Sequence, residues 1–545
     1  MHDAFPENLQ ALLQPGSYPH VVETVDLVET HISWILLTGK FAYKIKRPVH
    51  YPFVDLRSPE RRRFLCYEEV RLNRRFASEL YLGVCQITLA DGEVRLDGSG
   101  LVIEHAVKML QFPREDELDC LLEDARIAPT ELTAFGRDLA QIHADLPIAE
   151  PDQVWGRPAT LRALIMENAE ECAQAAMAFG SADEVRALRT ILGASLEAAA
   201  PCMSERFTGG RVRECHGDLH VRNIVRWESR LLAFDCLEFE PAFRWIDVAD
   251  EVAFVLADLE VCGQPLHAQT FLDGYLAHSG DYQACQLLEL YKAHRALVRA
   301  KVVALSAISD TTRSPVETAV ARQRHAAYLE CARHSLTPKQ KILILMSGFS
   351  GSGKSWVAQR LAPLLGAIHL RSDVERKRPA VLSVSAGSGS GLGQGLYSPA
   401  VSSAVYERLA QCTVDTLAGG YSAIVDATFN RREDRARFRD FSAELGVTAC
   451  IVHCHAPPHE FTARIIERGE RGGDPSEADP STVHWQAIHY EPIQPEESFI
   501  LFEAMTTEGD VIDALMRQLT ALTRVNTTAV AIETGPVPST GTPAI

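Results

Sequence analysis

The chain has 545 residues, too many for one hydrophobic core, so about two to four domains are expected. Its composition is typical of a globular protein, with 46% hydrophobic and 23% charged residues. A formal net charge of -18 argues against a general nucleic-acid or membrane-surface binder, because both depend on a basic surface.

The ends and cysteines of the chain predict its compartment. The first residues lack the basic-then-apolar pattern of a secretory signal, and no apolar window of about 18 residues predicts a membrane span. The 13 cysteines lie scattered in apolar runs, as reduced core thiols do. We therefore expect a cytoplasmic protein. His453-Cys454-His455, with His459, lacks a second ligand group in the sequence, so we expect a structural role rather than a metal site.

The first part of the chain reads as a β-rich lobe with one helix. Strands are expected at 21–29, 34–38, 40–46, 84–89, 93–96 and 101–109. A helix is expected to begin at Ser58-Pro59 and to run to about residue 78. Glu69 falls inside its apolar stripe and needs a cation. Lys44 and Lys46 share a face of the preceding strand, and the sequence leaves open which of them pairs with Glu69, with Lys44 favoured.

Helical segments dominate the next part of the chain. Helices are expected over 131–146, 160–200 and 251–330. Together with the β-rich lobe they define a first domain over 1–332, followed by a linker over 333–340 that contains Pro338.

A polar motif lies inside this first domain. His216-Gly217-Asp218-Leu219-His220 is followed by Asn223 and then by a strand at 231–234 that ends in Asp235. Kinase-type phosphoryl transfer needs a carboxylate at the substrate hydroxyl, and an amide and a second carboxylate that hold Mg²⁺. The spacing predicts Asp218 for the first role, and Asn223 and Asp235 as metal ligands.

This part resembles the aminoglycoside phosphotransferase and choline kinase-like enzymes over about residues 21–330. The resemblance rests on the HGDLHxxN motif and on Ala42-Tyr43-Lys44, which is similar to the strand lysine motif of that family. It implies an α+β, protein-kinase-like bilobal domain in which Lys44 and Glu69 bind the nucleotide and Asp218 is catalytic. The loop at 29–33 lacks the glycines of the protein-kinase cover. The segment from Arg244 to Asp250 is similar to a structural acidic segment of the family.

A phosphate-binding loop follows the linker. An apolar strand at 342–346 leads into GFSGSGKS at 348–355, and then into a helical pattern. This order of strand, GxxxxGK[ST] loop and helix predicts a P-loop, in which backbone amides and a lysine hold phosphates and a hydroxyl holds Mg²⁺. The predicted nucleotide-binding residues are Gly348, Ser350, Gly351, Ser352, Gly353, Lys354 and Ser355, the last also as a metal ligand.

Strands alternate with helices after the P-loop. Asp373 and Asp426 follow two of these strands, so an α/β P-loop NTPase domain with a parallel sheet is expected over 341–525. A Gly/Ser-rich stretch at 383–395 is expected to be a mobile loop, and 526–545 a disordered tail. The arginines at 431–437 are expected on a solvated helix face.

This second half resembles P-loop kinases of small substrates: gluconate kinase, chloramphenicol phosphotransferase, zeta toxin and the kinase domain of polynucleotide kinase. The resemblance rests on the P-loop, on D-x-x-R at 373–376 and on D-x-T-x-N at 426–430. It implies that Asp373 is the catalytic base and that Arg376 and Asp426 contact the acceptor. It also implies that Arg468 and Arg471 are catalytic lid arginines.

The sequence therefore predicts an ATP-dependent phosphotransferase with two Mg-ATP sites and small-molecule hydroxyl acceptors. Two alternatives stay open. The second half could phosphorylate nucleic-acid 5′-hydroxyl ends, although its near-neutral charge argues against this. One half could instead be a regulatory ATP-binding module. The sequence names neither the acceptors nor the oligomeric state.

Overall fold

The computed structural model describes residues 5–51, 54–309, 313–380, 395–471, 476 and 480–533. Within these ranges no helix is both long enough and apolar enough to cross a membrane. The chain divides into two compact units, which are Met1–Ser279 with Leu287–Leu336 and Gly280–Gln286 with Thr337–Ile545. The division after Leu336 falls inside the predicted linker, although helix α9 already includes the first three linker residues.

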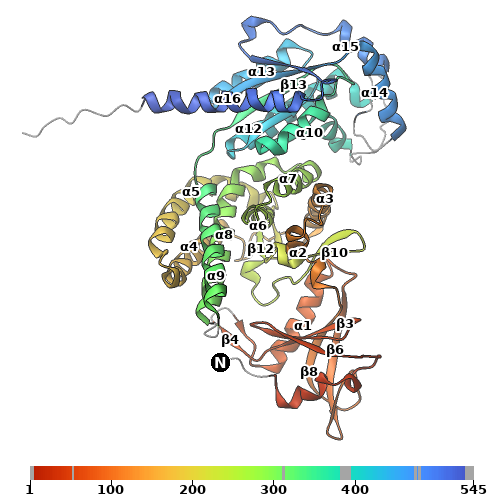
Figure 1. Ribbon diagram of the computed structural model, residues 1–545, viewed down its shortest axis with the longest axis vertical. Helices are drawn as coiled ribbons and strands as arrows, with labels where there is room; N and C mark the ends of the chain where they lie inside the picture. The colour runs from red at the N-terminus through yellow and green to blue at the C-terminus, as the bar shows by residue number, and fades with distance from the viewer. Residues whose placement is uncertain are drawn as a thin grey trace, which may run out of the picture. The chain divides into compact units, whose positions relative to one another are not determined.

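The first unit begins with an antiparallel sheet of six strands in the order β1-β2-β3-β8-β6-β7 (Figure 1). These strands are β1 Asp26–Glu29, β2 Ser33–Leu37, β3 Phe41–Lys46, β6 Tyr81–Ala90, β7 Glu93–Leu96 and β8 Leu101–Leu110. A separate pair is formed by β4 His50–Tyr51 and β5 Val54–Asp55. Alternate residues such as Trp34 and Leu36 of β2 and Tyr43 and Ile45 of β3 enter one buried apolar cluster, as the period of two requires.

Helix α1, Pro59–Asn73, packs on this sheet and begins where the sequence predicts. The Ser58 hydroxyl caps it by accepting a hydrogen bond from the Arg61 N–H at 3.4 Å. The helix ends earlier than expected, because Asn73 makes bonds of its own: its amide donates to the Glu69 carbonyl at 2.8 Å and accepts from the Cys236 N–H at 2.9 Å.

A helical lobe completes the first unit. Its helices are α2 Leu118–Glu123, α3 Pro129–Asp145, α4 Pro158–Ala175, α5 Ala182–Thr208, α6 Val248–Val261, α7 Pro265–Ser279, α8 Cys285–Ser309 and α9 Pro315–Ser335. Two strand pairs interrupt them: β9 Val212–Glu214 with β12 Trp245–Asp247, and β10 Ile224–Trp227 with β11 Arg230–Ala233. Gly136 and Gly274 let α3 and α7 cross closely, since a Cβ at either glycine would lie within 2.3 Å of a carbonyl oxygen of the other helix.

The second unit is built on a parallel sheet of five strands in the order β14-β15-β13-β16-β17. They are β13 Ile342–Ser347, β14 Ala367–Arg371, β15 Ser422–Asp426, β16 Thr448–His455 and β17 Ile500–Met505. The helices are α10 Lys354–Leu365, α11 Ser372–Lys377, α12 Pro399–Ala418, α13 Arg432–Glu444, α14 Pro458–Arg471, α15 Pro480–Ile488 and α16 Val511–Glu533. Alternate residues of β13 and β16 pack against α10 and α16 on one face. Helix α12 contacts β14 and β15, and α13 contacts β16.

Both predicted fold classes are confirmed: an antiparallel sheet with helices in the first unit, and a parallel P-loop sheet in the second. Two local expectations fare differently. The disordered tail was expected from residue 526, but α16 continues to Glu533, because no proline or glycine interrupts it before Gly535-Pro536. Apart from Gly395, the Gly/Ser-rich stretch at 383–395 lies outside the described residues.

Candidate functional site

A buried ion-pair network joins β3 to α1 in the first unit. The Lys44 Nζ lies 2.9 Å from Oε1 of Glu69, and the Lys46 ammonium pairs with Oε2 of the same carboxylate. Glu69 is fully buried. Burial alone would raise its pKa, but the two lysines lower it to about 2. The choice between Lys44 and Lys46 that the sequence left open is thus answered by both lysines.

Two further carboxylates extend the network. Glu238 pairs with Lys46, and Asp235 pairs with Lys44. Burial and the neighbouring Glu69 raise the pKa of Glu238 above its ordinary value. Three carboxylates therefore surround two ammonium groups. The Asp235 side chain is 43% exposed and is open to a cation.

Asp235 follows β11 in an unusual backbone conformation. Its φ is 65°, in the left-handed region that few residues other than glycine, asparagine and aspartate adopt. Its N–H donates to the Tyr81 hydroxyl at 3.0 Å. The carboxylate is thereby turned toward Lys44, which it contacts as an ion pair.

The predicted catalytic loop lies beside this network. The Asn223 amide donates to the Asp218 carbonyl at 2.9 Å and to Oδ2 of its carboxylate at 3.3 Å, and the N–H of Phe234 donates to the Asn223 carbonyl. Asn223 is thus next to the segment that carries Asp235. His220 Nε2 lies 3.5 Å from Asp218 Oδ2. Burial alone would raise the pKa of the Asp218 carboxyl, but His220 and Arg299 hold it below its ordinary range.

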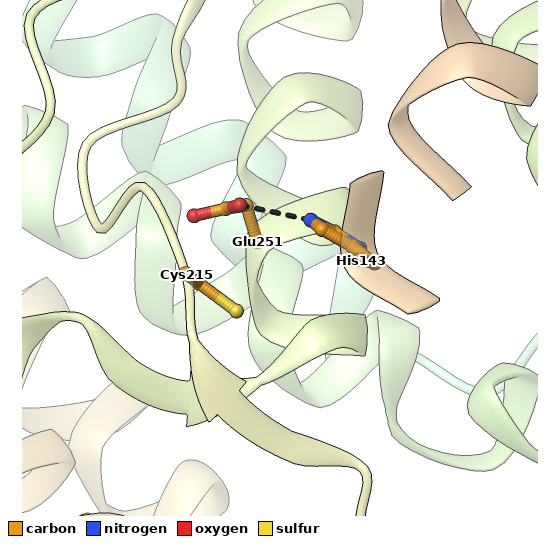
Figure 2. A group of neighbouring side chains, drawn as sticks. All are labelled: His143, Cys215 and Glu251. Carbon is orange, nitrogen blue, oxygen red and sulfur yellow. Dashed lines mark hydrogen bonds and ion pairs between the residues drawn. The ribbon is translucent and has the colours of Figure 1, made fainter. Parts of the chain in front are cut away.

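Residues that the sequence did not predict support this loop through hydrogen bonds. The Gly217 N–H donates to Oε1 of Glu251 at 2.8 Å, and Oε2 of Glu251 lies 2.9 Å from His143 Nε2. The other His143 nitrogen lies 2.9 Å from the Tyr275 hydroxyl. Figure 2 shows His143 and Glu251 joined in this way, with Cys215 beside them. His143 lies on α3 and Glu251 on α6, so this support depends on the packing of two helices that are far apart in the sequence. No local motif could have predicted it.

The acidic segment that was expected to be structural makes buried ion pairs. The Asp247 carboxylate takes two hydrogen bonds from Arg206, at 2.7 and 2.8 Å, and caps α6 through the Ala249 N–H. Asp250 takes two from Arg295, which also donates to the Gly217 carbonyl at 3.4 Å. These contacts agree with a structural role.

The P-loop of the second unit has the backbone that its glycines predict. Gly348, Gly351 and Gly353 have φ of 132°, 82° and 95°. A Cβ on Gly348 or Gly351 would lie 2.3 or 2.7 Å from a carbonyl oxygen, so larger residues would displace the loop. The Ser352 hydroxyl is buried without a hydrogen-bond partner. An unpaired buried donor fits a loop shaped to receive phosphate oxygens.

Lys354 stands at the start of α10. Its Nζ donates to the Phe349 carbonyl at 2.9 Å, and no carboxylate of the described residues forms an ion pair with it. Burial lowers the pKa of Lys354, although Asp426 nearby opposes this shift. The ammonium is thus held inside the loop with its charge uncompensated, as a phosphate ligand requires.

Asp426 lies at the end of β15, next to the P-loop. His369 Nε2 lies 3.2 Å from its Oδ2, and the carboxylate and Ser355 line one cavity. Burial alone would raise its pKa, but His369, Arg371 and Ser355 lower it to about 2. A carboxylate beside the P-loop hydroxyl is a fitting ligand pair for Mg²⁺. The contact of Asp426 with the acceptor stays a prediction, and its position in the same cavity as Ser355 also suits a metal ligand.

A cavity of about 910 Å³ opens from the P-loop. Its lining includes Lys354, Ser355, Asp373, Arg376, Asp426 and Arg468. Asp373 and Arg376 are three residues apart on α11, which presents both to the same space.

Of the predicted arginines Arg376 and Arg471, the structure describes the side chain of Arg376. Arg376 donates to the Leu396 carbonyl at 2.9 Å and to the Ser402 hydroxyl at 3.2 Å, while its buried Nε has no hydrogen-bond partner. Its guanidinium lies over the Tyr397 ring. The side chain of Arg471 lies outside the described residues.

The expectation of a solvated arginine run over 431–437 is wrong for Arg435. Its side chain is fully buried and donates to both carboxylate oxygens of Glu497 at 2.7 Å. Arg435 points inward because it lies three residues before the core residue Phe438 on α13. Arg431 and Arg437 line the cavity.

Comparisons with known proteins agree with this geometry. The protein-family model described as an AAA domain matches residues 343–493. Uncharacterized proteins of Mycobacterium tuberculosis and Mycobacterium bovis are 29% identical over 450 residues, which cover 83% of this chain and 87% of each relative.

Two solved structures show a distant likeness to the chain. Amicoumacin kinase is 13% identical and covers 58% of this chain and 89% of its own, with a TM-score of 0.35. A gluconokinase from Sinorhizobium meliloti is 16% identical and covers 36% of this chain and 99% of its own, with a TM-score of 0.24. The second unit thus contains the parallel sheet and P-loop that the AAA-domain model matches, and the first unit combines an antiparallel sheet with a helical lobe.

Proposed function

We propose that the chain is a phosphotransferase with two Mg-ATP sites, each passing the γ-phosphoryl group of ATP to a hydroxyl of a small molecule. The observation that carries the proposal is the shared cavity of the second unit. The P-loop residues Lys354 and Ser355 open into the same space as Asp373, Arg376 and Arg468. One cavity thus offers both phosphate-binding and acceptor-binding groups.

In the first site, Lys44 is oriented by Glu69 toward the phosphates of ATP. Asp235 and Asn223 supply the oxygens that suit a hard divalent cation. Mg²⁺ when bound would supply the charge that spans the phosphate oxygens. Asp218 is 39% exposed and ionised, so it can receive the proton of an acceptor hydroxyl.

In the second site, the loop amides and Lys354 bind the phosphates, and Ser355 with Asp426 holds the metal. Asp373, which lines the same cavity, is the candidate base. Arg376 positions the acceptor, and Arg468 stabilises charge that develops on the transferred group. The cavity volume falls within the roughly 300–1,000 Å³ of small-ligand pockets, which favours a small acceptor over a polymer.

The experiment is ADP release by the full chain against aminoglycosides, sugars, nucleosides and 5′-hydroxyl oligonucleotides. Asp218→Asn should abolish one set of activities and Lys354→Met another. Matched controls are Asp145→Asn on the exposed end of α3 and Arg360→Met on α10, which should leave both sets unchanged.

Four outcomes would overturn parts of the proposal. Turnover that survives Asp218→Asn with every acceptor would remove the first site. Wild-type ATP affinity of the second unit in Lys354→Met would remove the P-loop assignment. Turnover by the second unit with oligonucleotides alone would replace the small acceptor with a nucleic-acid end, and ATP binding without turnover by one unit would make that unit a sensor.

A further inference from the structure

We propose that His453, His455 and Glu503 form a binding site for a divalent transition metal such as Zn²⁺. The site lies on the parallel sheet of the second unit and is separate from the Mg²⁺ position at Ser355 and Asp426. It goes beyond the proposed phosphotransferase activity, since none of its three residues has a part in that chemistry.

The strand register brings the three side chains together. His453 and His455 are two residues apart on β16, so both point to the same face of the sheet. Glu503 on β17 is the parallel partner of His453, which places its side chain on that face as well. Their ligand atoms all lie within 4.8 Å of one another. His455 Nδ1 lies 3.5 Å from Glu503 Oε2.

The ligand set selects the class of metal. Two imidazoles and one carboxylate suit zinc and other first-row transition metals, whereas Mg²⁺ and Ca²⁺ prefer oxygen ligands alone. The side chains of His455 and Glu503 are 37% and 54% exposed, so a cation can enter and retain water.

The neighbours of His453 hold one ligand in place. Its Nδ1 lies 3.4 Å from the Ser347 hydroxyl, and its ring stacks on Tyr490 at 6.3 Å between centroids. A hydrogen-bonded and packed imidazole is a common support for a metal ligand. Tyr490 also contacts Phe349 of the P-loop and lines the cavity, so a bound metal would fix one side of that loop.

A second ligand-like cluster in the described residues lacks this capacity. His143, Cys215 and Glu251 also lie together, as Figure 2 shows, but both His143 nitrogens and both Glu251 oxygens have hydrogen-bond partners inside the protein. Burial raises the pKa of Cys215 well above its ordinary value, so the sulfur remains a thiol. That cluster positions the catalytic loop, and the β16–β17 cluster is left as the metal candidate.

The test is a zinc titration of the full chain, stripped with a chelator, in competition with a chromophoric chelator. Wild type should bind one equivalent of Zn²⁺, and the Co²⁺ form should lack a thiolate charge-transfer band, because the ligands are nitrogen and oxygen. His455→Ala and Glu503→Gln should each weaken binding at least tenfold. The matched control is His459→Ala, since this 79%-exposed histidine is close in sequence but outside the cluster.

Two results would overturn the proposal. One is equal zinc affinity in wild type, His455→Ala and Glu503→Gln, which would place any bound metal elsewhere. The other is a thiolate band in the Co²⁺ spectrum, which would assign the metal to the cysteines. The two ligand variants lie on exposed side chains, so each can be checked for wild-type circular dichroism before titration.

Discussion

The two candidate sites hold their lysines in opposite ways. In the first unit, Lys44 lies between Glu69 and Asp235, and its charge is already compensated before any ligand binds. In the second, Lys354 donates to the Phe349 carbonyl and, among the described residues, has no other hydrogen bond and no ion pair. The first site is rich in carboxylates, whereas the second presents an uncompensated cation.

This difference in lysine pairing predicts how each site binds ATP. In the first site the Lys44 charge is already paired and the exposed Asp235 carboxylate is open to a cation, so nucleotide should bind there together with metal. The P-loop can attract phosphates through Lys354 and its amides even before metal is bound. Variants of the Lys44 network and of Lys354 should therefore affect ATP binding in different ways.

The largest effect is expected from a variant that removes the catalytic carboxylate of the first site and leaves the second site unchanged. Asp218→Asn should lower turnover of the first site by about 10²–10⁴-fold, because a neutral amide cannot accept the hydroxyl proton. ATP binding should be retained, since within the described residues no hydrogen bond or ion pair joins Asp218 to Lys44 or Lys46. The measurement is kcat with the acceptor of the first site, beside ATP binding by calorimetry. A similar loss with the acceptor of the second site would mean that the two sites act as one.

The next effect tests the buried network itself. Glu69→Gln should destabilise the first unit by about 3–5 kcal/mol, because two buried ammonium groups lose a shared carboxylate. Glu238→Gln is the matched control: it also removes a buried carboxylate beside Lys46, but the raised pKa of Glu238 means that its charge is disfavoured in the fold. Chemical denaturation should show the smaller loss for Glu238→Gln. Equal losses would contradict the asymmetry.

Lowering the pH should show how much the ionised Glu69 carboxylate stabilises the first unit. The folded pKa of Glu69 is about 2, below its ordinary value of 4.5, so its contribution is present above pH 4.5 and is lost as the pH falls toward 2. The loss is about 3 kcal/mol, from roughly 1.4 kcal/mol for each pKa unit. Unfolding free energies measured across this window should fall more steeply in wild type than in Glu69→Gln. Parallel curves would argue that other carboxylates dominate acid unfolding.

The smallest effect concerns the P-loop. Lys354→Met should weaken ATP binding by the second unit by about 10- to 100-fold, the value of one charge-assisted hydrogen bond. Stability should change little or rise, because a buried cation without a carboxylate partner is removed. Arg360→Met, an exposed change on the same helix, should leave affinity unchanged. Strong destabilisation by Lys354→Met would show that the lysine supports the fold rather than the ligand.

Local motifs predicted much of both sites. The P-loop is recognisable because strand, glycines and helix are consecutive, and the Asp218 loop because its spacing is fixed by one turn. Lys44, Lys46 and Glu69 were paired correctly from their faces on one strand and one helix.

Features that depend on distant segments were missed. Glu251 supports Gly217 from another helix, and Glu503 meets His453 only through the register of two parallel strands. Arg435 looked like one of several surface arginines until Glu497 was brought beside it. Each of these pairings is set by tertiary packing, on which residue spacing along the chain carries no information.

The left-handed backbone at Asp235 limits which side chains that position accepts. Alanine there would add a conformational penalty to the loss of the carboxylate, and glycine would relieve the backbone while removing every side-chain atom. Asparagine tolerates this conformation and keeps the shape without the charge. Asp235→Asn therefore removes the charge of this residue while it keeps the backbone conformation of the turn.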